Sequence, residues 1–557
     1  MNLKNILNNF LWRKEEKYDF TLCQSKNSNN ANYIDDQLNL PENMFNSLSD
    51  NINIIKSRFN SMINTDIIIR EFYININQRK IKAFIIFIDG MVDLNLVNNY
   101  ILKPLMLNTT NNSENKILKE SNKKNNKFTR SKKIFLEQSI SNTLLPQNNI
   151  KKQRSFSEII SSINSGDCAL FIDSLPFAFD LDVKGFKQRS ISTPNNEVII
   201  KGPQEAFVEN LRTNTSMLRR IINNENLIIE NVNIGKITKT KCAICYMRNI
   251  ANDDLIAEVK YRINNLEIDS LLASGQLEQL IANENYIGIP EIISTERPDK
   301  TTKYLLQGRV IVIVNGCPYS IIMPGLFIDF MSSPEDSNIK PYFANFLRLI
   351  RLLSLTITLL LPGIYVAITN FHQEILPTEL LNSILSARQS VPFPVIFEIL
   401  IMEISFELIR EAGVRVPSPV GPTIGIVGAL VLGQAAVSAN IVSPILIIIV
   451  ALTGIASFAI PDFSFGFHLR IFRFAFIVLG YIAGFLGIGI GIFVYISNLC
   501  SIKSFGVSYL VPYAPKEDSN KNGYIIPPIW KQEFRANYLS TKRKEAQEKI
   551  SMKWRYK

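Results

Sequence analysis

Three long stretches without a charged side chain lie in the last third of this 557-residue chain. They cover residues 352–371, 416–461 and 474–502. A bilayer core of about 30 Å needs roughly 20 apolar helical residues for each crossing, and charged side chains are costly in hydrocarbon. The residues before these stretches are polar and mixed in pattern. The sequence therefore predicts a soluble module followed by an all-α membrane domain.

The pattern divides the chain into five segments. We expect a flexible tail over residues 1–40, a mixed α/β subdomain over 41–200, a second over 201–345, the membrane domain over 346–500 and a basic tail over 501–557. The start of the chain lacks an apolar run as long as that of a secretory signal. Both subdomains are therefore expected to lie in the cytosol.

The net charge of +11 comes from two segments. Residues 107–154 carry eleven Lys and Arg against three Glu, and residues 531–557 carry nine against three. The basic balance is therefore no evidence for a specific nucleic-acid partner. The first segment is rich in Asn and Lys and is expected to be disordered. A compositional bias of the genome explains it, as would non-specific contact with anionic lipid or nucleic acid.

Local patterns predict several elements of the soluble part. Strands are expected at 66–73, 82–89 and 167–173, and helices at 94–107, 203–222 and 253–266. Residues 309–323 predict a hairpin with a type I′ turn at Asn315-Gly316. In the helix at 203–222, Gly202 precedes Pro203 at the first helical position. Glu205 in the first turn and Arg219 and Arg220 in the last turn would complement the helix dipole.

The sequence offers little chemistry for an enzyme. It contains no phosphate loop, nucleophile elbow or zinc motif. Six scattered cysteines favour a reducing compartment over a disulfide framework. Cys242 and Cys245 have redox spacing, but residues three apart in a strand face opposite sides, so we interpret both as core residues. We expect no enzyme activity, cofactor or metal site.

The topology of the membrane domain depends on residues 391–411. The basic tail should be cytosolic by the positive-inside rule, and two cytosolic ends need an even number of crossings. We expect four spans with residues 391–411 as an interfacial or re-entrant helix, and the spans are 352–371, 421–441, 444–460 and 474–497. This arrangement places Arg470 and Arg473 on the outer side. Five spans would instead export the basic tail.

Three glutamates interrupt the apolar residues 391–411. Glu403 and Glu407 share one helical stripe with Arg410 and Glu411, whereas Glu398 points away. Around the axis of an oligomer, Glu403 and Glu407 could form an acidic ring that favours cations. The alternative is a solvated interfacial face in which these glutamates pair with Arg410 or Arg415.

Other residues of the predicted membrane domain suggest close helix packing or a water-lined path. The small residues Gly480, Gly484, Gly487 and Gly491 repeat at spacings that allow close helix contact. Gln434, Ser438 and Asn440 interrupt the longest uncharged stretch and need polar partners or water. A hydrogen bond between helices and the lining of an ion path explain them equally well.

Six motifs in a fixed order carry a family resemblance. They are GPQEAFVENLRTNTSMLRR (202–220), RPDK (297–300), LLQGRVIVIVNGCP (305–318), LPGIYVAITNFHQE (361–374), VPFPVIFEILIMEISFELIREAGVRVPSPVG (391–421) and SFGVSYLVPYAP (504–515). Over roughly residues 60–515 the chain resembles the A subunit of the GerA-type spore germination receptors. The first motif contains Gly202, Pro203, Glu205, Arg219 and Arg220. A paralogous stage V sporulation membrane protein shares most of these motifs.

The resemblance implies an assembly in the spore inner membrane. It implies a two-part cytosolic domain that faces the spore core, a membrane B subunit and a lipoprotein C subunit as partners, and a nutrient germinant sensed by the complex. It further implies a homo-oligomeric, nutrient-gated cation channel in which A subunits form the pore. A non-conducting membrane scaffold of the receptor is the alternative, and conductance of the reconstituted protein would distinguish the two.

Overall fold

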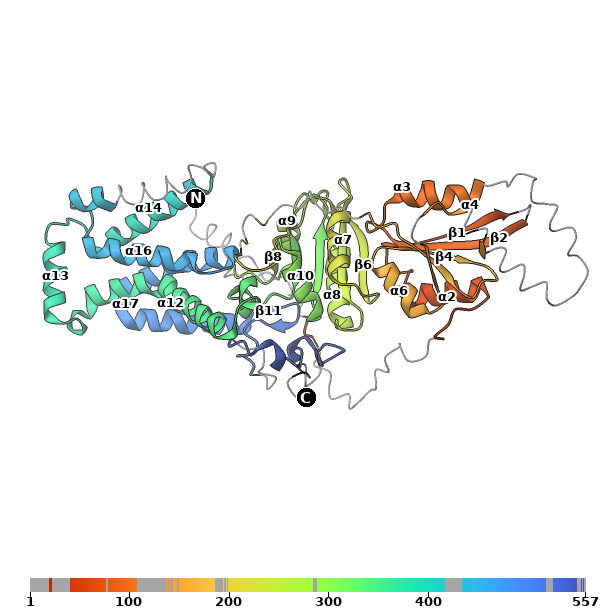
Figure 1. The fold of residues 1–557 in the computed structure, drawn as a ribbon. Coiled ribbons are helices and arrows are strands. Elements are labelled where there is room, and N and C mark those ends of the chain that lie inside the picture. Colours follow the sequence, from red (N-terminus) through yellow and green to blue (C-terminus); the bar gives the residue numbers. More distant parts are fainter. Residues whose placement is uncertain are drawn as a thin grey trace, which may run out of the picture.

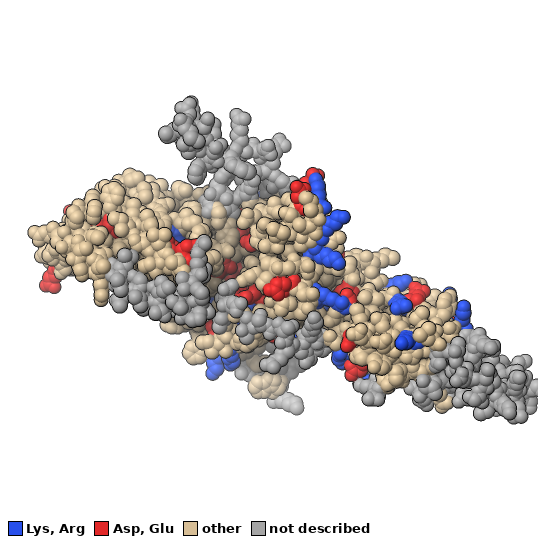
Figure 2. Space-filling view, turned by 90° about the horizontal axis from the view of Figure 1, so that it is seen from above, with Lys and Arg blue, Asp and Glu red and all other residues tan. Residues whose placement is uncertain are grey.

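The computed structural model describes residues 20–22 and most of 41–547, with the longest gaps at 108–136, 186–193 and 416–432. Most of the expected tail and of the Asn/Lys-rich insert therefore lies outside the described residues. The molecule is elongated, with an α/β unit at one end, a second α/β unit in the middle and a bundle of helices at the other end (Figure 1). On the face shown in Figure 2, charged side chains are sparse over the bundle and gather over the α/β units.

The first unit is an antiparallel sheet covered by helices on both faces. Its strand order is β1-β2-β4-β5-β3. The strands are β1 (Ile67–Ile76), β2 (Arg79–Ile88), β3 (Ile150–Gln153), β4 (Cys168–Ile172) and β5 (Ala178–Leu181). Helices α2 (Leu48–Arg58) and α6 (Phe156–Asn164) cover one face, and the continuous helical segment α3 (Leu94–Leu96), η2 (Val97–Leu102) and α4 (Lys103–Leu107) covers the other. The predicted strands and the helix at 94–107 are confirmed.

The middle unit repeats this plan with the strand order β6-β7-β9-β10-β8. Its strands are β6 (Leu227–Ile234), β7 (Thr240–Met247), β8 (Ile293–Thr295), β9 (Val310–Val314) and β10 (Ser320–Met323). Helices α7 (Leu211–Ile221) and α10 (Pro298–Leu306) cover one face, and α8 (Asp253–Asn264) and α9 (Ser274–Ile281) cover the other. Cys242 and Cys245 lie on opposite faces of β7, as predicted, and burial raises the pKa of each thiol to about 12.

Two local predictions in this unit are wrong. Helix α7 begins at Leu211, not at Pro203, because the side chain of Asn210 caps it by accepting a hydrogen bond from the Thr213 amide at 3.1 Å. The predicted hairpin forms, but five residues (315–319) separate β9 from β10. Of the two predicted turn residues only Gly316 has a positive φ, which excludes a type I′ turn.

The bundle contains the remaining long helices. They are α12 (Pro341–Phe371), α13 (Thr378–Arg388), α14 (Val395–Arg415), α16 (Pro444–Phe458) and α17 (Phe463–Ser501). Short elements α11 (Phe327–Phe330) and η4 (Pro334–Ser337) lead from the middle unit into α12, and η5 (Gln373–Ile375) follows it. By length and composition, α12 and α17 could each cross a membrane, whereas α16 is shorter.

Helix α17 is a helical hairpin. Its backbone leaves the helical region at Ala483 and at Gly484, whose φ of 57° and ψ of −139° suit glycine. His468 Nε2 lies 3.1 Å from the hydroxyl oxygen of Tyr495, although 27 residues separate them. In a straight helix that separation would be about 40 Å. The chain therefore reverses at residues 483–484, where the imidazole of His372 accepts a hydrogen bond from the Phe485 amide at 3.4 Å.

These contacts revise the expected topology. A single span over 474–497 is wrong, because the chain turns back within it. Helix α14 packs along α16: Glu398 contacts Ser443 near one end, and Arg410 contacts Ser457 near the other. Most of the expected span at 421–441 lies outside the described residues. The prediction of four spans is not confirmed.

The residues after the bundle return to the middle unit. Strands β11 (Lys503–Ser504) and β12 (Val507–Ser508) form a small ribbon, and Phe505 and Tyr509 are fully buried. The short helices η7 (Ile529–Lys531) and η8 (Asn537–Leu539) follow. Much of the described tail is therefore packed against the folded core, which its basic composition did not predict.

Candidate functional site: a buried charge cluster in the bundle

Five charged side chains meet where α14 faces the first arm of α17. Glu403 and Glu407 lie one turn apart on α14, as predicted, and Arg410 follows on the same stripe. Arg473 and Arg470 lie on α17 at a spacing of three residues, so they share one face of that arm. The two helices run antiparallel, which places Arg473 opposite Glu403 and Arg470 opposite Glu407.

The distances show how the charges are shared. Glu403 Oε2 lies 2.7 Å from Arg473 Nη2. Glu407 Oε1 is approached by Arg410 Nη1 at 3.0 Å, by Arg470 Nε at 3.3 Å and by Arg473 Nη2 at 3.4 Å. The side chains of Glu403 and Arg473 are only 1% and 2% exposed. Burying a charge is costly unless it is paired, so this pairing keeps both ions within the bundle.

This arrangement changes how the stripe of Glu403 and Glu407 on α14 is interpreted. Two carboxylates face three guanidiniums, so the cluster as a whole is not acidic. Glu407 keeps a side-chain exposure of 30%, whereas Glu403 is enclosed. The sequence contained the signal for the missing partners, because Arg470 and Arg473 are charges between two apolar segments. Their pairing with α14 required the tertiary structure.

Glu398 belongs to a second contact near the other end of α14. Its Oε1 lies 3.4 Å from Arg388 Nε on α13, and its Oε2 accepts a hydrogen bond from the Ser443 amide at 3.2 Å. That amide precedes the first turn of α16, where a carboxylate is favourable. Glu398 therefore joins three helices and takes no part in the Glu403–Arg473 cluster.

The three polar residues of the uncharged stretch are exposed. Residues 433–438 are helical and carry Gln434 and Ser438 on their outer side. Asn440 lies in the following turn with a φ of 51°, a conformation that Asn tolerates better than most residues. None of the three contacts the charge cluster in the described hydrogen bonds and ion pairs.

The four glycines lie at close approaches within one chain. A Cβ at Gly480 would lie 2.5 Å from the carbonyl oxygen of Gly363, where α17 crosses α12. Gly484 forms the turn of the hairpin. A Cβ at Gly487 would run into the carbonyl oxygen of Leu479, and one at Gly491 would lie 2.7 Å from the Leu479 side chain. The small-residue spacing thus allows packing between the arms and against α12.

Charged contacts also connect the units. Arg219 donates to both oxygens of Asp66, the residue before β1, at 2.8 and 2.9 Å and so joins α7 to the first unit, while Arg220 pairs with Glu205. Arg348 and Arg351, in the first turns of α12, both bind Asp336 of η4; the shortest distances are 3.1 and 2.7 Å. The positions of Arg219 and Arg220 in the last turn of α7 were predicted. Their partners were not.

The described residues contain no cluster of metal-ligating side chains. The arrangement offers ion pairing and helix packing within an apolar bundle, and it brings no nucleophile and general base together at the charge cluster. Its chemistry is that of ion pairs within a helical bundle, two of whose helices are long and apolar enough to cross a membrane.

Comparisons with known proteins agree with the motifs. The sequence model of the family described as Bacillus/Clostridium GerA spore germination protein matches residues 53–538. Spore germination protein KA of Bacillus subtilis is 39% identical over 487 residues, covering 87% of this chain and 86% of that protein. The uncharacterized membrane protein YfkQ and spore germination protein B1, both from B. subtilis, are each 36% identical, covering 84% and 81% of this chain and 86% and 89% of their own lengths.

One solved structure is also similar. It is the crystal structure of the N-terminal domain of the A subunit of the Bacillus megaterium spore germinant receptor GerK3. The sequence identity is 29% and the TM-score is 0.37, and the alignment covers 52% of this chain and 99% of that chain.

Proposed function

Because the chain belongs to the GerA family of spore germination proteins, we propose that it is the A-type subunit of a nutrient-responsive receptor in the spore inner membrane. Its α/β units and basic tail would face the spore core. Its partners would be a membrane B subunit, a lipoprotein C subunit and further copies of itself. Apolar side chains on the outside of the bundle, among them Phe493 (74% exposed) and Ile455 (68% exposed), support contact with lipid or with other membrane helices.

We further propose that several copies form a cation path. The observation that carries this proposal is the outward position of Gln434 and Ser438 on an otherwise apolar bundle. In hydrocarbon such groups need polar partners or water, and a ring of copies would supply both. Glu403 and Glu407 would border the same path, with Glu407 as the more accessible carboxylate. Asn440 would lie at one end of it.

Conductance tests this function. The full chain, reconstituted with its B and C subunits in liposomes, should release K⁺ when a germinant is added. Gln434→Leu and Ser438→Ala should lower this flux without lowering the amount of protein in the membrane. Glu398→Gln is the matched control, because the Glu398 carboxylate is fully buried, paired with Arg388 and hydrogen-bonded to the Ser443 amide. Normal flux in the Gln434/Ser438 double variant would contradict the path.

A non-conducting scaffold remains the second candidate. The observation in its favour is that arginines of the same chain neutralise Glu403 and Glu407. A scaffold would hold the B and C subunits together and show no flux of its own in any reconstitution. The scaffold would be supported by a variant of this chain that no longer holds the B and C subunits together while the subunits that remain in the membrane still show normal flux.

A further inference from the structure

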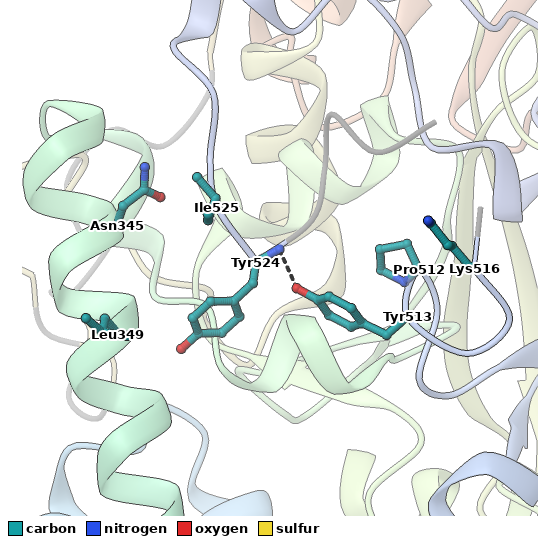
Figure 3. Close-up of a pocket in the computed structure, with 7 residues that line it drawn as sticks. All are labelled: Asn345, Leu349, Pro512, Tyr513, Lys516, Tyr524 and Ile525. Carbon is teal, nitrogen blue, oxygen red and sulfur yellow. Dashed lines mark hydrogen bonds between the residues drawn. The ribbon is translucent and has the colours of Figure 1, made fainter. Parts of the chain in front are cut away.

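A pocket lies where the tail crosses the start of α12. Its volume is about 690 Å³, which is within the usual range of ligand sites. Asn345 and Leu349 of α12 form one wall, and Pro512, Tyr513 and Ile525 of the tail contribute to the others. Figure 3 shows Leu349 and Lys516 on opposite sides of it. The pocket is therefore apolar toward α12 and carries a cation on the far side.

Hydrogen bonds hold in place the tail residues that line the pocket. Asn345 Nδ2 donates to the Ile526 carbonyl at 3.1 Å, and the Ile526 amide donates to Asn345 Oδ1 at 2.7 Å. The Tyr524 amide donates to the Tyr513 hydroxyl at 2.8 Å (Figure 3). Arg348 donates to the Tyr524 carbonyl at 2.7 Å. The described walls are thus held by the fold and do not depend on a ligand.

The position of the pocket indicates a membrane surface. The uncharged stretch of α12 starts at Leu352, about 4.5 Å further along the helix axis than Leu349. Tyr342, Phe346, Leu349 and Leu353 form one apolar stripe and are 88%, 61%, 60% and 59% exposed. Aromatic and apolar side chains of this kind gather at the level of lipid headgroups.

We propose that this pocket binds one anionic phospholipid of the leaflet that faces the α/β units. Lys516 binds the phosphate. Leu349 and Ile525 contact the upper part of an acyl chain, which continues along the exposed stripe of α12. The charge of the site fits this ligand, because Lys516 is the only charged side chain among the described lining residues and basic side chains beside a membrane helix attract anionic lipid. The site goes beyond the proposed conduction and does not require it.

Native mass spectrometry of the full chain in mild detergent tests the site. The protein is titrated with phosphatidylglycerol or phosphatidylcholine of the same acyl chains, and bound lipids are counted. We expect one phosphatidylglycerol to bind at least fivefold more tightly than phosphatidylcholine. Lys516→Gln should weaken phosphatidylglycerol about fivefold, the effect of one basic residue near an anionic surface. Lys531→Gln is the matched control on the same tail and should change binding less than twofold.

Further arms separate other occupants. Leu349→Trp should fill the pocket and remove the tight lipid while leaving the mass of the protein assembly unchanged. Equal affinity for the two lipids in the wild-type protein would overturn the proposal without depending on any variant. Displacement of the lipid by millimolar inorganic phosphate would assign the site to a free anion. Loss of a dimer or larger assembly in Leu349→Trp, with lipid binding unchanged, would assign it to a second copy of the chain.

Discussion

Two buried groups of ion pairs, one between the α/β units and one inside the bundle, satisfy their carboxylates to different degrees. Both oxygens of Asp66 accept hydrogen bonds from Arg219, at 2.8 and 2.9 Å. In the bundle, one oxygen of Glu407 faces three guanidiniums, and neither oxygen of Glu403 has a well-aligned hydrogen bond despite its contact with Arg473. The Asp66 carboxylate therefore has one partner in one arrangement, whereas the Glu407 carboxylate has several partners at similar distances.

This difference suggests different tasks for the two regions. A carboxylate that is fully hydrogen-bonded to a fixed arginine rigidifies its surroundings. A shared carboxylate can exchange one arginine for another at little cost, which is what a rearranging element needs. We therefore expect the contact between the α/β units to hold these units together, and the cluster in the bundle to exchange partners when the bundle rearranges. The following predictions test this contrast, beginning with the largest expected effect.

The contact between the α/β units should contribute most to stability. Asp66→Asn leaves the buried Arg219 without a counter-charge, and breaking such a pair costs about 3–5 kcal/mol. We expect a marked fall in the thermal midpoint of the full chain in detergent and a smaller yield. Asp50→Asn, on the exposed side of α2, is the control. A fall no larger than that of the control would show that the contact is dispensable.

The helix crossing that supports the charge cluster should be the next most sensitive. Gly480→Ala places a methyl group 2.5 Å from the Gly363 carbonyl oxygen, so α17 must shift against α12. Overpacking of this kind typically costs about 1–3 kcal/mol. Gly489→Ala is matched in chemistry and lies on the same hairpin, but its Cβ would meet nothing within 4 Å. Equal thermal midpoints for both variants would contradict the close crossing.

The charge cluster should show a cost no larger than that of the helix crossing and a stronger effect on function. Glu403→Gln removes a carboxylate without aligned hydrogen bonds, and Arg473 retains Glu407 at 3.4 Å. We expect a loss of about 1–3 kcal/mol together with altered K⁺ flux. A double-mutant cycle with Arg473→Gln measures the coupling of the pair. A coupling as large as that between Asp66 and Arg219 would remove the contrast between the two regions.

The sequence predicted the elements better than their meeting points. Strand β2 was predictable because its residues alternate between two apolar clusters, with Ile85 in one and Ile86 in the other. The hairpin of α17 was not, since an apolar run has the same pattern whether the helix continues or turns back at Gly484. The glutamate stripe was predicted from helical periodicity alone. Its pairing with Arg470 and Arg473 was not, because it depends on which helices lie side by side.

A carboxylate at the junction of the two regions gives the smallest expected effect. Glu278 lies on α9, where burial, together with the nearby charge of Asp462, raises the pKa of its carboxyl from 4.5 to about 7. The folded chain therefore binds this proton more tightly than the unfolded chain does. The stabilisation is complete below about pH 4.5 and is lost as the pH rises toward about 7.

Between pH 5 and pH 8 this group should lower the thermal midpoint of the wild-type chain, relative to Glu278→Gln, by about 1–2 °C. Glu267→Gln, which removes a carboxylate from the same unit where its side chain is 84% exposed, serves as the control and should run parallel to the wild type. If the thermal midpoint of Glu278→Gln also changes with pH in parallel with that of the wild type, the surroundings of Glu278 do not distinguish its protonated from its ionised carboxyl. The pH dependence of the whole chain would then have to come from other groups.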